Sequence, residues 1–198
     1  MPTGVAIRDV REQLFAAAER VLVRDGPNAL TSRAVTMEAG CAKGVLHRHF
    51  DDFDAFLAEL VRDRIAAVEA RGAALRGVAG TGTVTGNVAA ALTDLFGPLA
   101  LGVLGLVTSR DALRARLRRT TPVGIPLLTE AGSVLAGYLA AERGLGRLVA
   151  DCDTDALAFA VIGSGHLLFT GRDGVAPPAA EVGRVVGTVL AGASPQAG

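Results

Sequence analysis

The stretch LTSRAVTMEAGCAKGVLHRHF, Leu30 to Phe50, decides the fold of this chain. It predicts two short helices joined by a tight turn. Thr31 is a suitable N-cap for the first helix, because its hydroxyl can accept a hydrogen bond from a free amide of the first turn. Gly40 can adopt the left-handed conformation that ends this helix. The second helix then opens at Ala42 or Lys43.

The second predicted helix has two different faces. Leu46 and Phe50 lie four residues apart and form an apolar stripe that we expect to be buried. The opposite face carries small, basic and hydrogen-bonding residues, namely Lys43, Gly44, Val45, His47, Arg48 and His49. A short helix with such a front suits the major groove of DNA.

This pattern resembles the helix-turn-helix of the TetR family of transcriptional regulators. The family pattern has a Thr cap, a short helix ending in Ala-Gly, a turn, and then Lys-Gly-x-Leu-Tyr-x-x-Phe. The chain has Thr31, Ala39-Gly40 and Lys43-Gly44-Val45-Leu46-His47-Arg48-His49-Phe50. It departs from the pattern at three places, with Ala42 for the usual Ser, His47 for Tyr, and Phe53 where members commonly have a Lys that reaches a phosphate.

The resemblance covers roughly the first third of the chain and implies an all-α fold. We expect a three-helix helix-turn-helix DNA-binding domain over residues 1–50, a connecting helix over 51–75, and a larger helical ligand-binding and dimerisation domain over 76–198. The expected DNA-binding residues are Thr31, Ser32, Arg33, Ala42, Lys43, Gly44, Val45, His47, Arg48 and His49. Arg8 and Arg11, on the first predicted helix, are further candidates for phosphate contacts, although solvated charges fit them equally well.

Composition limits the alternatives. Of the 198 residues, 50% are hydrophobic but only 4% are aromatic, which favours close helix packing around a large core. The formal net charge is +0, so DNA binding requires a local basic patch. Two cysteines make no disulfide framework, and a cytoplasmic location is the default. No signal peptide is evident, and the apolar stretches 95–109 and 156–171 are too short for a membrane span.

Helical patterns continue along the rest of the chain. A helix runs from Asp51-Asp52 to near Gly72, and the Gly- and Thr-rich stretch 76–86 is expected to be a flexible connection rather than a phosphate loop. Further helices are expected around residues 88–96, 99–107, 111–120, 127–139, 154–171 and 178–190. The arginines of 110–119 are interpreted either as a solvated helix face or as a site for an acidic ligand or DNA.

The last two helices are apolar on more than one face, which predicts either a subunit interface or core. The interface candidates are Phe159, Gly163, Leu167, Val182, Val185, Val186 and Val189. The resemblance implies a homodimer with two recognition helices, so double-stranded DNA with an inverted repeat is the expected operator. It also implies a small-molecule pocket, for which the candidates are Phe96, Leu99, Val103, Leu106, Leu128 and Tyr138, with Asn87, Thr93 and Thr129 as polar contacts.

The sequence thus predicts a regulator, a repressor by family habit, that a small, largely apolar effector releases from DNA. The sequence has no acid–base pair in a supporting motif, nucleotide loop or metal-ligand cluster that would predict an enzyme, a cofactor or a metal site. The alternative is a dimeric helical small-molecule-binding protein with a weakened DNA-binding motif. Salt dependence separates the two, because DNA binding weakens steeply with salt.

Overall fold

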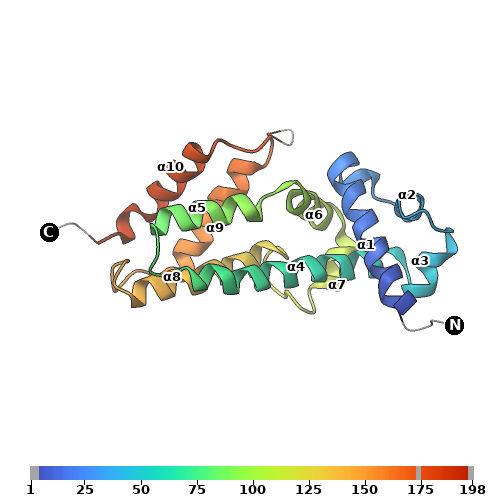
Figure 1. Ribbon diagram of the computed structural model, residues 1–198, viewed down its shortest axis with the longest axis horizontal. Coiled ribbons are helices and arrows are strands. Elements are labelled where there is room, and N and C mark those ends of the chain that lie inside the picture. The colour runs from blue at the N-terminus through green and yellow to red at the C-terminus, as the bar shows by residue number, and fades with distance from the viewer. Residues whose placement is uncertain (1–4, 173–174, 196–198) are drawn as a thin grey trace. The chain divides into compact units, whose positions relative to one another are not determined.

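The computed structural model describes residues 5–172 and 175–195. These residues form ten α-helices and two short 3-10 helices, and no strand occurs among them, as the sequence predicted (Figure 1). Contacts divide the chain into two compact units. The first unit comprises the described residues of 1–64 and 98–126, and the second unit those of 65–97 and 127–198. The domain boundaries predicted at residues 50 and 75 separate regions of different expected function, and they stay a prediction.

The first unit begins with the helix-turn-helix. Helix α1 (Val5–Asp25) ends before Gly26, whose φ of 80° is left-handed, and the 3-10 helix η1 (Pro27–Ala29) follows. Helix α2 (Ser32–Glu38) is capped as predicted, since the Thr31 hydroxyl accepts a hydrogen bond from the Ala34 amide at 3.1 Å. Gly40, at φ 66°, provides the predicted left-handed turn. Helix α3 then spans Gly44–His49.

An aromatic cluster holds α3 against α1 and the start of α4. The ring centroids of Phe50 and Phe56 lie 5.0 Å apart in an edge-to-face arrangement, and Phe15 of α1 lies 6.0 and 5.6 Å from them. Leu46, from the middle of α3, is fully buried. Edge-to-face aromatic packing adds to the free energy of area burial. The cluster therefore fixes the orientation of α3.

Two helices from the middle of the sequence complete the first unit. Helix α6 (Pro98–Ser109) is apolar and packs on α1, as the sequence led us to expect of a buried helix. At Gly102 the two helices are close, since a Cβ atom there would make an ordinary van der Waals contact with Leu22 of α1 at 3.5 Å. Helix α7 (Asp111–Leu117) buries Leu113 and Leu117. Residues 98–126 thus pack with the helix-turn-helix, although the sequence places them after the predicted domain boundary.

Helix α4 (Phe53–Gly77) is longer than the sequence predicted. Its N-terminus is capped as expected, since the Asp52 carboxylate accepts a hydrogen bond from the Ala55 amide at 2.7 Å. The predicted end near Gly72 is wrong, because the helix continues to Gly77. Gly72 is a packing position rather than a stop, for Val134 of α8 fills the space where its side chain would be.

The second unit is built from α5 (Val84–Leu95), α8 (Leu128–Gly144), α9 (Thr154–Phe169), α10 (Ala179–Leu190) and η2 (Ala191–Ala193). Helix α9 lies along α8, and α10 packs on α5 and α9 (Figure 1). The Asp153 carboxylate caps α9, and Pro178 precedes α10. Within the described ranges, no single helix is both long and apolar enough to cross a membrane; α5 and α6 reach that length only as a bent pair.

Candidate nucleic-acid interface and cavity

The front of α3 is open to solvent. Its N-cap Lys43 is exposed, and so are Gly44, His47 and Arg48, together with Ala42 in the preceding turn. Val45 and His49 are half-buried. The structure thus brings the predicted recognition residues to one surface, on the side of α3 away from buried Leu46. A helix of this kind can present side chains to a groove while its other face stays fixed.

The start of α2 lies in the same unit and carries the other three predicted DNA-binding residues. Thr31 and Arg33 are exposed, and the Thr31 hydroxyl is already engaged as the helix cap. Ser32 is half-buried, and its hydroxyl oxygen is inaccessible and has no hydrogen-bond partner among the described residues. Free amide groups at the first turn of a helix favour a phosphate nearby.

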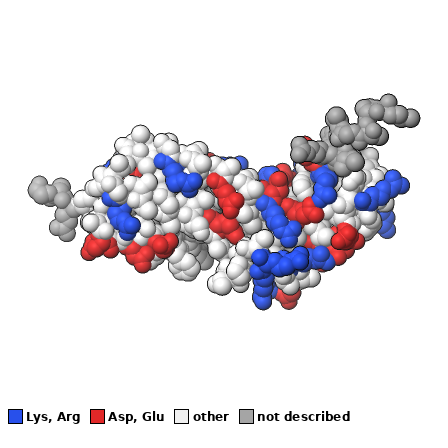
Figure 2. All heavy atoms as spheres, turned by 90° about the horizontal axis from the view of Figure 1, so that it is seen from below, with Lys and Arg blue, Asp and Glu red and all other residues white. Residues whose placement is uncertain are grey.

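Several cations of the first unit are held in ion pairs, whereas the cations of this front are not; Arg62, Arg118 and Arg119 of the same unit also form no ion pair among the described residues. On α1, Arg20 and Arg24 both bind Glu38 of α2, at 2.7 and 2.8 Å, and these two guanidinium groups lower the pKa of the Glu38 carboxyl. Arg64 of α4 pairs with Glu19. By contrast, Arg33, Lys43 and Arg48 form no ion pair with any described residue. On the face drawn in Figure 2, blue and red side chains lie interspersed, in keeping with such pairing.

Arg11 has a structural role that the sequence did not reveal. Its guanidinium group pairs with Glu59 of α4, lies 4.3 Å from the centroid of the Phe50 ring, and donates to the backbone oxygen of His49 at 3.3 Å. These contacts tie α1 and α4 to the C-terminal end of α3. The interpretation of Arg11 as a charge engaged within the protein fits this arrangement better than a free phosphate contact. The side chain of Arg8 lies outside the described part.

The arginines of 110–119 are largely engaged with neighbouring carboxylates. Arg110 pairs with Asp54 at 3.1 Å, and Arg116 pairs with Asp52 at 2.5 Å. Arg114 pairs with Asp111 within α7. The pKa of the Asp52 carboxyl is lowered, first by the hydrogen bond from the Ala55 amide and then by Arg116. These pairs fasten α7 to the start of α4, which favours a structural reading of the segment.

The second unit contains a cavity of about 420 Å³ between α4, α5 and α8. This volume is within the range of small-molecule sites. Aliphatic and small side chains dominate the wall, and the only polar side chains on it are Arg71, Asn87 and Asp94. The remaining lining residues are Val68, Gly72, Ala74, Leu75, Val78, Val88, Ala90, Ala91, Leu92, Leu95, Ala131, Val134, Leu135 and Ile162.

None of the six predicted ligand-binding residues lines this cavity, so that prediction is wrong for it. Leu99, Val103 and Leu106 belong to α6 in the first unit. Phe96 is buried against Phe169, with ring centroids 5.4 Å apart. The remaining two predicted ligand-binding residues lie on α8. Leu128 is half-buried at the first turn of this helix, and Tyr138 is buried in a hydrogen-bond network. The predicted residues Phe96, Val103 and Leu106 are buried in the core and do not line the cavity.

The predicted polar contacts of the ligand behave differently from one another. Asn87 lines the cavity, as its assignment requires. Thr93 is exposed and donates its hydroxyl proton to the Ala89 carbonyl of its own helix at 2.9 Å. Thr129 is exposed on α8 and is absent from the cavity wall. Only one of the three therefore remains a candidate. No group of three His, Cys, Asp or Glu side chains in the described ranges is placed to hold a metal ion.

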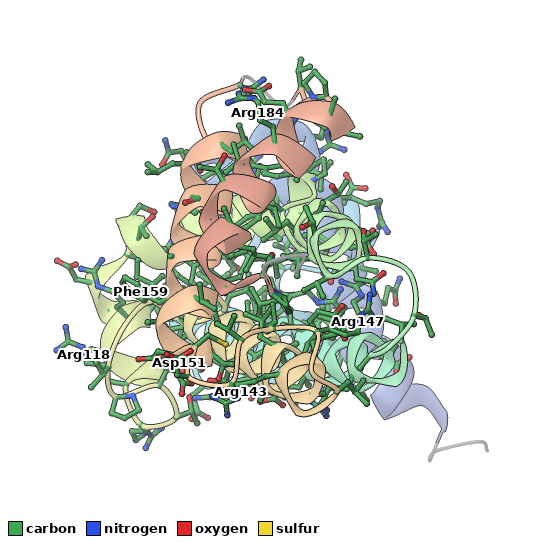
Figure 3. All side chains as sticks on the ribbon, turned by 90° about the vertical axis from the view of Figure 1, so that its left-hand side faces the viewer. Arg118, Arg143, Arg147, Asp151, Phe159 and Arg184 are labelled. Carbon is green, nitrogen blue, oxygen red and sulfur yellow. The ribbon has the colours of Figure 1, made fainter. Side chains whose placement is uncertain are left out.

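The proposed interface residues fall into three groups by exposure. Phe159 and Leu167 of α9 are 83% and 79% exposed, and Gly163 lies between them one turn from each. Figure 3 shows Phe159 at the outer side of α9. Val182 and Val186 of α10 are only 1% exposed and lie in the core of the chain itself, so their assignment to an interface is corrected. Val185 and Val189 are half-buried.

The described residues form a helix-turn-helix whose second helix faces solvent, and a cavity lies among the other helices. This combination is typical of helix-turn-helix regulators. Residues 14–60 match the family described as bacterial regulatory proteins, tetR family. This match confirms the resemblance of the N-terminal residues to the TetR family that was seen in the sequence. No curated protein matches the chain.

Solved structures agree with this assignment at the level of the fold. A TetR-family transcriptional regulator from Agrobacterium tumefaciens has a TM-score of 0.72 and 16% identity, covering 96% of this chain and 100% of that one. The regulator FadR from Bacillus subtilis, in complex with stearoyl-CoA, has a TM-score of 0.70 and 18% identity, covering 91% and 98%. The multidrug binding protein EbrR, complexed with imidazole, has a TM-score of 0.60 and 18% identity, covering 95% and 96%.

Proposed function

We propose that the chain is a homodimeric transcriptional repressor that binds an inverted-repeat operator and is released by a small, largely apolar effector. One observation carries the DNA-binding part of this proposal. The cations on the exposed front of α2 and α3, Arg33, Lys43 and Arg48, have no carboxylate partner among the described residues, whereas Arg20, Arg24 and Arg64 of the same unit do. An α-helix fits the major groove of DNA, and cations on it that have no carboxylate partner can bind phosphates and base edges.

The residues of α3 have separate roles in this proposal. Lys43 and Arg48 donate hydrogen bonds to guanine edges or phosphates. Val45 packs on a thymine methyl group, and Gly44 lets the backbone approach the DNA closely. The imidazole ring of His47 donates one hydrogen bond to a phosphate. The sugar-phosphate backbone of the DNA lies next to the first turn of α2, with Thr31, Ser32 and Arg33, and next to the turn residue Ala42.

Dimerisation places two copies of α3 on the operator. The exposed face of α9, with Phe159, Gly163 and Leu167, supports a subunit contact, because large apolar side chains of this exposure are rarely left in water as a continuous stripe. Val185 and Val189 of α10, which are half-buried, are the further candidates for this contact. A two-fold dimer reads half-sites whose centres lie roughly 34 Å apart, or a multiple of this distance.

The cavity supports the effector part of the proposal. Its volume and aliphatic wall suit a small, largely apolar molecule. Two of the similar structures, FadR with stearoyl-CoA and EbrR with imidazole, were solved with small molecules. A ligand that binds the released conformation better than the DNA-bound one shifts the population between them.

The test of the proposed function is fluorescence anisotropy of the protein with its own upstream intergenic DNA. We expect tight binding that Arg48→Ala weakens strongly. The matched control is Arg184→Ala, because Arg184 is an exposed arginine on α10 in the second unit and forms no ion pair among the described residues. Equal losses for both variants would contradict the role of α3. Binding no better than to random DNA, here and at other genomic sites, would favour the small-molecule-binding alternative.

A further inference from the structure

Asn87 links the cavity to a buried polar network in the second unit. It lies in the first turns of α5, and it is the only uncharged polar side chain on the cavity wall. The two charged side chains of the wall, Arg71 on α4 and Asp94 on α5, are exposed and opposite in sign. The wall contains no aromatic ring. Asn87 is therefore the one uncharged side chain of the wall that can give polar recognition.

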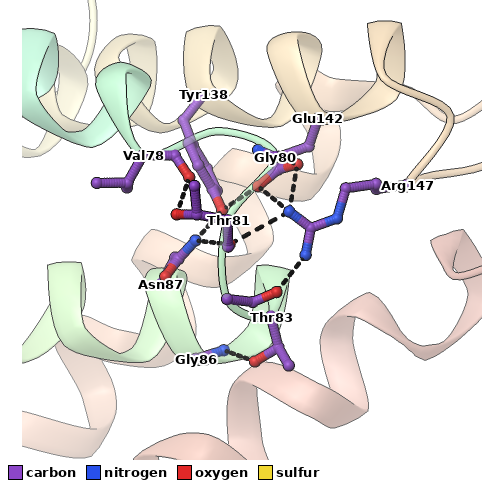
Figure 4. A network of polar contacts seen from close by, with 10 residues as sticks. Val78, Gly80, Thr81, Thr83, Gly86, Asn87, Tyr138, Glu142 and Arg147 are labelled. Atoms are coloured by element: carbon purple, nitrogen blue, oxygen red, sulfur yellow. Dashed lines mark hydrogen bonds and ion pairs between the residues drawn. The ribbon is translucent and has the colours of Figure 1, made fainter.

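The orientation of the Asn87 amide is fixed by its partners. Its Nδ2 donates to the Thr81 carbonyl oxygen and to the Tyr138 hydroxyl oxygen, both at 2.9 Å (Figure 4). Because a carbonyl oxygen can only accept, the atom that faces Thr81 is the amide nitrogen rather than the oxygen. The two N–H groups of the side chain are thus both in use.

Glu142 holds the rest of this arrangement in place. Its carboxylate is fully buried, and it accepts hydrogen bonds from the Tyr138 hydroxyl at 2.5 Å and from the Gly80 amide at 3.1 Å. Arg147 pairs with it at 3.2 Å and also donates to the carbonyl oxygens of Thr81 and Gly82. The loop between α4 and α5 was expected to be a flexible connection. Instead, its backbone is bound by these side chains (Figure 4).

Tyr138 keeps its proton in this network. Burial, followed by the hydrogen bond to Glu142, raises the pKa of its hydroxyl to about 12. At neutral pH the hydroxyl therefore donates to Glu142 and can only accept from Asn87. The Asn87 Oδ1 atom accepts no hydrogen bond from any described residue, and in Figure 4 it points away from the dashed contacts.

We propose that Asn87 Oδ1 is the polar recognition atom of the cavity, and that its ligand is an uncharged aliphatic molecule whose head group donates a hydrogen bond, such as an alcohol or a primary amide. This rests on the proposed effector role of the cavity. A head group that only accepts, such as an ester, leaves Oδ1 unpaired when water is displaced, which costs binding free energy. A carboxylate meets no net positive charge, because Arg71 and Asp94 offset each other.

The experiment is calorimetric titration of the full chain, without DNA, with octanamide, 1-octanol, methyl octanoate and octanoate. We expect octanamide and 1-octanol to bind at least about tenfold more tightly than methyl octanoate and octanoate, the factor that one unpaired polar group typically costs. The ligand series on the unaltered protein decides the question whether or not any variant folds. Equal affinities, tighter binding of the ester or the carboxylate, or no binding at all would overturn the proposal.

Two variants locate the effect. Asn87→Ala should remove the preference for octanamide over methyl octanoate. Arg147→Lys is the matched control, because Arg147 holds the same loop but does not line the cavity. It should keep the preference, and a loss in Arg147→Lys equal to that in Asn87→Ala would assign the effect to the loop instead. Since DNA is absent, a failure of operator binding does not affect this outcome.

Discussion

Gly72 of α4 lies directly against Val134 of α8, so that a Cβ atom on residue 72 would be only 2.7 Å from both Val134 methyl carbons. The two helices meet at this point because one of them has no side chain there. The same glycine and valine line the cavity. The spacing of α4 and α8, and with it the shape of the site, therefore depends on a hydrogen atom at position 72.

Gly72→Ala should lower the free energy of unfolding, by about 1–3 kcal/mol, because the new methyl group overpacks a close helix contact. The measurement is urea denaturation followed by circular dichroism. Gly77→Ala is the matched control, since Gly77 belongs to the same helix and a methyl group added there would meet nothing within 4 Å. Replacing that glycine should be neutral or stabilising. Similar losses in both variants would show that the effect does not come from the contact with Val134.

The cap of α2 gives a second test. Thr31→Ala removes the hydroxyl that accepts from the Ala34 amide, and it should cost about 1 kcal/mol of stability. Thr31→Ser keeps the hydroxyl and should retain most of the stability. Thermal unfolding of the three proteins checks the order. If Thr31→Ser were destabilised as much as Thr31→Ala, the methyl group rather than the cap would be responsible.

Alkaline pH should reveal the environment of Tyr138. Its pKa of about 12, against about 10 for an unfolded tyrosine, means that the folded protein keeps a proton that the unfolded chain releases. The free energy of unfolding therefore falls as the pH rises from about 10 to about 12. Because the chain has one tyrosine, phenolate absorbance reports on this group alone. A phenolate midpoint that is the same with and without denaturant would contradict the buried network.

Dimerisation can be tested separately from folding. Phe159→Arg places a charge on the exposed face of α9, and it should convert the dimer to a folded monomer in light-scattering measurements. Leu145→Arg is the control, because Leu145 is 57% exposed at the end of α8 and is not one of the proposed interface residues. This variant should stay dimeric. A Phe159→Arg protein that remains dimeric would place the subunit contact elsewhere.

The helix-turn-helix was predictable because its signals are local. Thr31, Gly40 and the apolar stripe of Leu46 and Phe50 act within a few residues of themselves, so their roles follow from spacing alone. The same reasoning failed at Gly72, where a glycine inside a helix was interpreted as its end. Whether a glycine ends a helix or admits a neighbour depends on a residue far along the sequence, here Val134.

The cavity could not be predicted for a related reason. Apolar periodicity identifies residues that leave water, and Phe96 and Val103 do so by filling the core. The cavity is lined by residues of different helices, such as Ala91 of α5 and Ala131 of α8, and only the packing of those helices decides where a space remains. The faces of α10 were similarly ambiguous, since four valines shared one pattern and contact with α5 and α9 buries only Val182 and Val186 fully.

The central claim is that α3 binds DNA through its unpaired cations, and a salt series measures this most directly. The logarithm of the affinity for the upstream intergenic DNA is plotted against the logarithm of the salt concentration for the unaltered protein and for Arg48→Ala. We predict a steep negative slope, a preference over random DNA of equal length, and a shallower slope for Arg48→Ala, because fewer counterions are released. Equal slopes for the two proteins, with no preference over random DNA, would contradict the account.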